Sequence, residues 1–141
     1  MVNLERFIKA QEGVYERALN EIKYGKKMTH WMWFVFPQFK GLGFSETAKF
    51  YEIKSLNEAK TYLEHNILGN RLKEISNVLI EIECNDANHI FGFPDDLKLK
   101  SCMTLFSVIS NDSKSIFNKV IDKFFNNEVD YKTINLINET K

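Results

Sequence analysis

The stretch LERFIKAQEGVYERALNEI, residues 4–22, sets the expectation for the fold of the whole chain. Its apolar side chains recur at spacings of three and four residues, which is the pattern of an amphipathic α-helix. Asn3 can cap the start of this helix, and Gly25 can end it. The stretch therefore predicts one long helix that packs a single face against a core.

Similar spacings and capping signals continue along the rest of the chain. Side chains that can accept a hydrogen bond from the first turn of a helix occur at Ser45, Ser55, Asp86, Ser113 and Asp130. Ser55 and Glu58 also match a capping box, in which each side chain accepts from the other residue's backbone amide. The expected helices cover residues 46–51, 56–63, 68–82, 87–92, 94–109, 116–125 and 131–138, and the fifth of these is apolar almost all round and is expected to be central.

The segment HWMWFVFPQ, residues 30–38, is the longest apolar part of the chain. Its periodicity does not separate strand from helix, but so many successive aromatic and aliphatic side chains must be buried on most sides. With helices expected all round, we predict a short buried helix that ends before Pro37. The fold class predicted for residues 1–141 is all-α, a compact single-domain bundle of about six to eight helices that includes this Trp-rich segment.

Composition excludes several classes of protein. Nineteen basic and nineteen acidic residues cancel, which argues against a nucleic-acid partner. No apolar run is long enough to cross a membrane, and the first residues do not match a signal peptide. Cys84 and Cys102 lack the spacing of a metal or redox motif, and the three histidines lack that of a zinc site. We therefore expect a cytoplasmic protein with no metal and no cofactor, whose oligomeric state the sequence leaves open.

Two blocks of sequence carry a family resemblance. The first is residues 30–38 with Gly41-Leu42-Gly43, and the second is IFGFPDDLKLKS, residues 90–101, followed by MTLF, residues 103–106. Both resemble the signature of an uncharacterised bacterial family, DUF1810, sometimes labelled calpastatin. The resemblance implies an all-α fold and no established activity. The calpastatin label conflicts with the composition, because that inhibitor is a disordered chain and this one has the residues of a folded core.

The first block supplies four candidate site residues. His30 can act as an acid or base near neutral pH, although a structural histidine at the edge of the core explains it as well. Trp31 and Trp33 point about 200° apart on a helix, so the simplest geometry does not let both line one pocket. Trp31, Trp33 and Gln38 are candidates for binding a ligand, although at least one of the tryptophans is expected in the core and both can belong to it.

The second block supplies five more candidates at the start of the predicted central helix. Asp95 is a candidate acid or base beside His30, and Asp96 a candidate ligand-binding residue, but both also suit the first turn of a helix. Lys98, Ser101 and Thr104 continue a polar stripe on an otherwise apolar helix. Such a stripe must be satisfied internally, meet a ligand or face solvent.

Two functions from different classes follow from these residues. The first is a module that binds a small ligand or a protein partner in a groove between the two blocks. The alternative is an enzyme for a nucleotide-like or ADP-ribose-like substrate, with His30 and Asp95 in acid–base roles, a tryptophan stacked on the base and Lys98 facing phosphate. The two differ in whether His30, Asp95 and Lys98 converge on one cavity.

Overall fold

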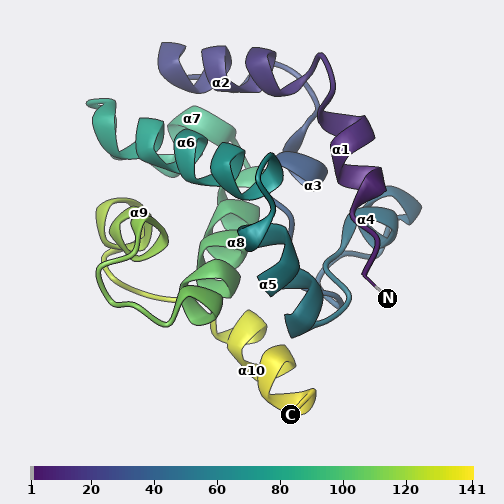
Figure 1. Ribbon diagram of the computed structural model, residues 1–141. Helices are drawn as coiled ribbons and strands as arrows, with labels where there is room; N and C mark the ends of the chain where they lie inside the picture. The colour runs from purple at the N-terminus through teal and green to yellow at the C-terminus, as the bar shows by residue number, and fades with distance from the viewer. Residues whose placement is uncertain (1) are drawn as a thin grey trace.

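The computed structural model describes residues 2–141 and is built from helices, which confirms the all-α prediction (Figure 1). Ten helices are present in this range, more than the six to eight expected, because the first predicted helix is split and the short ones stand as separate elements. They are α1 Glu5–Gln11, α2 Tyr15–Tyr24, α3 Met32–Val35, α4 Glu46–Tyr51, α5 Leu56–Glu64, α6 Leu68–Glu81, α7 Ala87–Phe91, α8 Asp95–Ser110, α9 Ile116–Phe125 and α10 Tyr131–Glu139.

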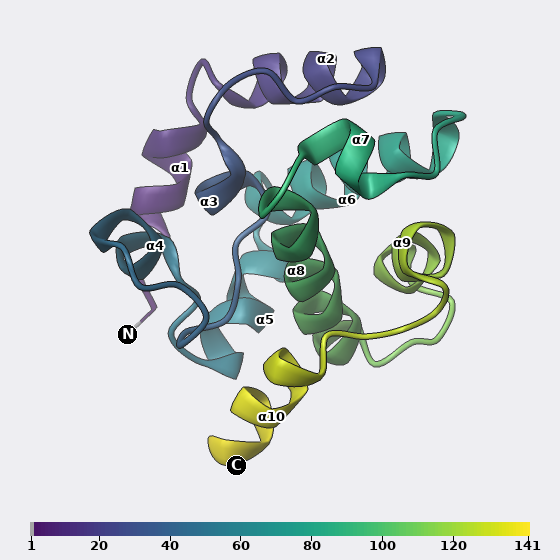
Figure 2. The ribbon, with the colours of Figure 1, turned by 180° about the vertical axis from the view of Figure 1, so that it is seen from behind.

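Helix α8 is the central helix, as its apolar sequence predicts. It contacts α5, α7, α9 and α10, and in both views it runs through the middle of the molecule (Figures 1 and 2). Seven of its residues are buried, including the whole run 101–106. Its first turn therefore lies between the Trp-rich segment and α10, where the candidate site is found.

The long first helix was predicted wrongly, because the chain turns at Gly13. This residue has φ +70°, which a glycine adopts at no steric cost and which ends α1 before α2 begins. The two halves pack against different partners, α1 on α3 and α2 on α6. At the break Gln11 is buried and donates its side-chain amide to the carbonyl of Phe34. Apolar spacing continued through the turn because both halves face the same core.

The Trp-rich segment folds as predicted, into a single buried helical turn that ends before Pro37. Trp31, which precedes α3, is fully buried and packs against Phe36 and Phe91. Beyond it, a backbone pairing of Phe39 with Ile53 ties the chain to the end of α4. This pairing joins the segment 36–39 to the residues that follow α4.

Four of the five predicted helix caps are confirmed, since Ser45, Ser55, Asp86 and Asp130 each accept from the third amide of their helix. The fifth is wrong: Ser115, not Ser113, accepts from the amide of Asn118 and caps α9. The capping box of Ser55 is only half formed. The carboxylate of Glu58 instead accepts from the amide of Lys54 and pairs with Arg6, because α1 brings that guanidinium within 2.8 Å.

Within residues 2–141 no helix is both long and apolar enough to span a bilayer.

Candidate functional site

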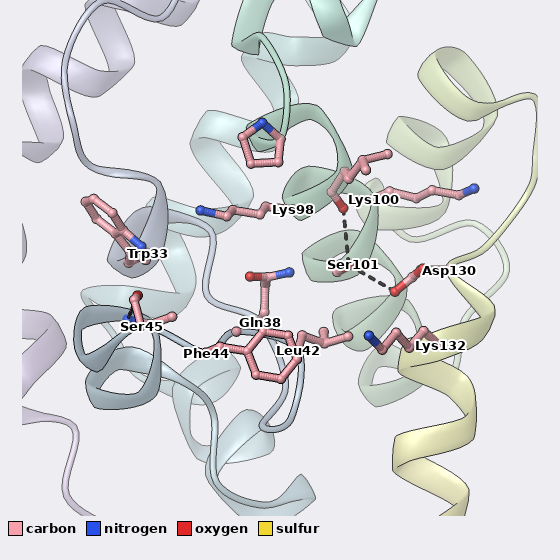
Figure 3. Close-up of a pocket in the computed structure, with 14 residues that line it drawn as sticks. Trp33, Gln38, Leu42, Phe44, Ser45, Lys98, Lys100, Ser101, Asp130 and Lys132 are labelled. Atoms are coloured by element: carbon pink, nitrogen blue, oxygen red, sulfur yellow. Dashed lines mark hydrogen bonds between the residues drawn. The ribbon is translucent and has the colours of Figure 1, made fainter.

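A cavity of about 440 Å³ opens between α3, the loop 38–45, the first turns of α8 and the start of α10 (Figure 3). Four of the predicted site residues line it: Trp33, Gln38, Lys98 and Ser101. They come from both sequence blocks, so the fold brings the two blocks together. We call this cavity the α8 pocket.

The two tryptophans have different surroundings. Trp33 is half-buried and lines the α8 pocket, whereas Trp31 is fully buried and does not reach it. The indole Nε1 of Trp31 donates to Glu21 Oε1 over 2.9 Å. This agrees with the expectation that one of the pair belongs to the core, and it leaves Trp33 as the tryptophan available to a ligand.

Glu21 organises the connection between α2 and α3. One carboxylate oxygen accepts from the amides of Met28 and Thr29 as well as from Trp31, and the other accepts from the hydroxyl of Thr29 over 2.6 Å. Desolvation by itself raises the pKa of the Glu21 carboxyl, but these four hydrogen bonds outweigh it and lower the pKa below its ordinary value. The carboxylate therefore serves to hold the connection in place.

Gln38 is held by its backbone and leaves its side chain in the pocket. Its carbonyl accepts from the amide of Ile53 over 2.8 Å, and the amide of Lys40 donates to the carbonyl of Ile53. Within residues 2–141 no protein group is hydrogen-bonded to its side-chain amide, which stands in the middle of the pocket (Figure 3). A fixed backbone with a free amide can present both a donor and an acceptor to a ligand.

Lys98 lies beside Trp33, with its ammonium 5.4 Å from the centre of that ring. The same ammonium is 3.4 Å from Asp95 Oδ1, and Lys27 pairs with Asp95 Oδ2 over 3.0 Å. Asp95 does not line the pocket, and both of its oxygens have a cationic partner. The carboxylate predicted as an acid or base is therefore an ion-pairing residue that joins α8 to the end of α2.

Ser101 lines the pocket but is satisfied by the protein. Its hydroxyl lies 2.9 Å from Asp130 Oδ2 and 3.1 Å from the carbonyl of Leu97. Thr104, one turn further on, is fully buried and accepts from the amide of Asp130 over 2.9 Å. Its prediction as a ligand-binding residue finds no support in this position, because the start of α10 covers it.

The remaining two predicted residues lie away from the pocket. Asp96 accepts from the side-chain amide of Asn88 over 3.3 Å and from the backbone of Leu97, which fits the helix-start interpretation. His30 is exposed, does not line the pocket, and makes no hydrogen bond or ion pair through its ring with the rest of residues 2–141. The predicted pairing of His30 with Asp95 is not present.

Several lining residues were not predicted. Phe44 and Leu42 come from the loop that follows Gln38, and Lys132 comes from the last helix. A Cβ on Gly43 would lie 2.4 Å from that of Ala48, so the loop packs on α4 at a point where only glycine fits. Two glycines next to an aromatic residue are only a weak sequence signal for a binding loop. Nothing in the sequence around Lys132 indicated that it lines a site.

The charges of the wall are nearly balanced. Lys100 pairs with Glu128 over 2.9 Å, and its ammonium points away from the cavity, so only its stem lines the wall. Lys132 has no ion pair within residues 2–141 and lies 6.0 Å from the ring centre of Phe44. In the part of the chain that is described, no three His, Cys, Asp or Glu side chains are grouped so that they could hold a metal ion.

Known proteins resemble this chain over nearly its whole length. The family described as "Protein of unknown function (DUF1810)" matches residues 1–137, which confirms the resemblance seen in the two blocks. The crystal structure of the conserved hypothetical protein Rv1873 from Mycobacterium tuberculosis is similar with a TM-score of 0.92 at 42% identity, and the match covers 96% of each chain. Comparison with curated proteins finds no match. The chain belongs to the DUF1810 family.

Proposed function

We propose that this protein is a binding module whose α8 pocket receives an anionic group. The observation that carries the proposal is the free side-chain amide of Gln38, set in the same cavity as the ammonium of Lys98 and the half-buried ring of Trp33. A few polar groups that converge in a largely apolar concavity are the usual composition of a binding site. The aromatic ring offers a flat surface beside the two polar groups.

The sign of the ligand follows from the charges around the cavity. Four ammoniums belong to the wall or to its direct ion-pair partners, those of Lys27, Lys98, Lys100 and Lys132. Three carboxylates face them, those of Asp95, Glu128 and Asp130, which leaves one positive charge. Lys27 and Lys98 share Asp95, which leaves one excess positive charge at the Trp33 end of the pocket, while Lys132 and Asp130 at the other end are equal in number without forming an ion pair within residues 2–141. An anion placed there is attracted by charge as well as by hydrogen bonds.

The enzyme alternative has less support. Its proposed acid–base pair consists of an exposed histidine, His30, and a carboxylate already paired with two lysines, Asp95. A general acid or base needs to be within hydrogen-bond reach of the reacting group, and neither residue lines the pocket. We therefore place binding, not catalysis, as the function of this site.

Nuclear magnetic resonance tests the proposal with an internal control, since the two indole N–H groups give separate signals. N-acetylglutamate, inorganic phosphate and adenosine monophosphate serve as anionic probes, and the uncharged molecules N-acetylglutamine α-amide and adenosine serve as neutral counterparts of the first and the third. We expect at least one anion to shift the Trp33 indole signal while that of Trp31, which is bonded to Glu21, stays in place. Neutral counterparts should bind at least about tenfold more weakly.

Substitution of single lysines identifies which ammonium group binds the anion. Lys98→Met should weaken the response at least about fivefold while the protein stays folded, because Asp95 keeps Lys27 as a partner. Lys60→Met, at an exposed lysine on α5 remote from the lining residues, is the matched control and should leave the response unchanged. The proposal fails if no anionic probe moves the Trp33 signal, or if both lysine variants weaken the response equally.

A further inference from the structure

The mouth of the α8 pocket is unusually apolar. Phe44 and Leu97 line the pocket yet are 80% and 51% exposed. Phe93, which is 76% exposed, directly precedes the lining residue Pro94, and Tyr131, 64% exposed, stands in the chain between two lining residues. These four make up half of the eight large hydrophobic side chains that are strongly exposed within residues 2–141. We call them the apolar rim.

This concentration of exposed apolar side chains requires an explanation. Single exposed apolar residues are ordinary, but several around one cavity mark a surface that something else covers. Phe44 and Leu97 are 80% and 51% exposed although they line the cavity of about 440 Å³, and the exposed Phe93 and Tyr131 adjoin lining residues in the chain without lining it, so a small molecule held inside the cavity would leave much of this apolar surface uncovered. The occupant that buries the whole rim is larger than the cavity.

We propose that the occupant is a segment of a partner protein, which inserts one aspartate or glutamate side chain into the α8 pocket and packs flanking apolar residues on the rim. This inference rests on the proposed function, because it assigns the anionic group to a peptide. Aromatic side chains around a desolvated centre are typical of the energetically important residues in protein interfaces. A flat apolar border around a polar centre therefore fits a peptide better than a free metabolite.

The charge of the pocket selects a carboxylate. One excess positive charge, located at Lys98, matches the single negative charge of an aspartate or glutamate side chain. A phosphate monoester carries about 1.5 to 2 negative charges at neutral pH, and the wall has no arginine to bind it in a bidentate manner. Lys98 and the amide of Gln38 can donate to the two oxygens of one carboxylate.

The loop that carries Phe44 supports a docking role. Gly43 packs so closely on Ala48 that the loop is fixed against α4, while Phe44 projects from it with its ring mostly in solvent. The ammonium of Lys132 lies on the pocket side at 6.0 Å from that ring. An aromatic residue held rigidly and left exposed loses little conformational freedom when a partner covers it.

Selection from a random library of linear peptides against the full-length protein tests the proposal. We expect the enriched peptides to share an aspartate or glutamate flanked by aromatic or aliphatic residues. A synthetic peptide of that consensus, followed by fluorescence anisotropy, should bind Phe44→Ser and Leu97→Ser at least about tenfold more weakly than the wild type. Tyr24→Ser, at a residue 83% exposed on α2, is the matched control and should bind normally.

The small-anion experiment separates this inference from the proposed function. Phe93→Ser, at a rim residue that does not line the pocket, should weaken binding of the consensus peptide and leave the shift of Trp33 by N-acetylglutamate unchanged, whereas Lys98→Met should weaken both responses. Enrichment of no peptide, or of peptides without an acidic residue, overturns the inference even where N-acetylglutamate still binds. Adenosine monophosphate that binds at least as tightly as the consensus peptide also overturns it, in favour of a nucleotide. Loss of every anionic response removes the proposed function itself.

Discussion

Trp31 and Trp33 are two residues apart in the chain but belong to different kinds of surroundings. Around Trp31 the polar groups are paired: its indole N–H, the backbone amides of Met28 and Thr29 and a threonine hydroxyl all donate to Glu21. Around Trp33 the side chain of Gln38 has no protein partner within residues 2–141, and the ring is half-buried. The surroundings of Trp31 stabilise the fold, and those of Trp33 are open to a ligand.

The comparison separates structural from binding residues better than residue type does. Buried polar groups in native proteins are almost always hydrogen-bonded, so a fully satisfied group needs no ligand to explain it. Thr104 and Ser101 are satisfied in this way, although both were candidates by sequence. A polar side chain that is positioned but unpaired in a cavity is the stronger sign of a site.

Truncation of the two tryptophans should give the largest contrast in stability. Trp31→Ala removes a fully buried indole and its hydrogen bond to Glu21, and we expect it to lower the free energy of unfolding by about 3–5 kcal/mol. Trp33→Ala, at a half-buried ring, should cost less than half as much. Urea denaturation of both variants measures this, and equal losses would contradict the distinction between the two surroundings.

Replacement of Glu21 should have an intermediate effect that depends on pH. Glu21→Gln removes the charged acceptor of four hydrogen bonds, and we expect a loss of about 1.5–3 kcal/mol at pH 7. Because the folded-state pKa of Glu21 is lowered, its stabilising contribution is present above the ordinary value of 4.5 and disappears as the pH falls through the lowered value.

Denaturant melts of wild type and Glu21→Gln at pH 7 and in acid test this sign. The difference in free energy of unfolding between the two proteins should shrink as the pH drops below 4.5. Glu16→Gln, at an exposed glutamate on the same helix, is the control. A difference that stays constant or grows in acid would show that the carboxylate charge does not stabilise this connection.

Substitution of Gln38 should have the smallest effect on stability. Because no group within residues 2–141 is hydrogen-bonded to its side chain, Gln38→Leu should change the free energy of unfolding by no more than about 0.5 kcal/mol. The same variant should weaken the response of the Trp33 indole to N-acetylglutamate, since one donor is lost. Thermal melts and the titration together test it: a destabilisation above about 2 kcal/mol would make Gln38 a structural residue like Glu21.

Local chemistry explains which parts of the fold were predictable. Four caps were correct because a side chain that accepts from an amide three residues later depends only on neighbours in the chain. The break at Gly13 was missed, because the apolar spacing continues through it. Ser113 was predicted as the cap of the helix 116–125, but Ser115, which directly precedes that helix, accepts from the amide of Asn118.

The candidate site was predictable only in part. Trp33, Gln38, Lys98 and Ser101 were chosen by residue type and do line one cavity. His30 and Asp95 were chosen in the same way. His30 is exposed outside the pocket, however, and Asp95 forms ion pairs with two lysines. Residue chemistry identifies groups able to bind or react, and it does not show which of them already have partners.

Thus the sequence alone determined the helical class, most helix starts, the buried Trp-rich turn and the central position of α8, because periodicity and capping act over a few neighbouring residues. The packing of the helices is needed to show that Trp33 faces the pocket, that Lys27 and Lys98 share Asp95, and that Phe44 and Lys132 complete the wall. Those contacts join residues far apart in the chain. Their geometry depends on how the helices pack, which no local pattern specifies.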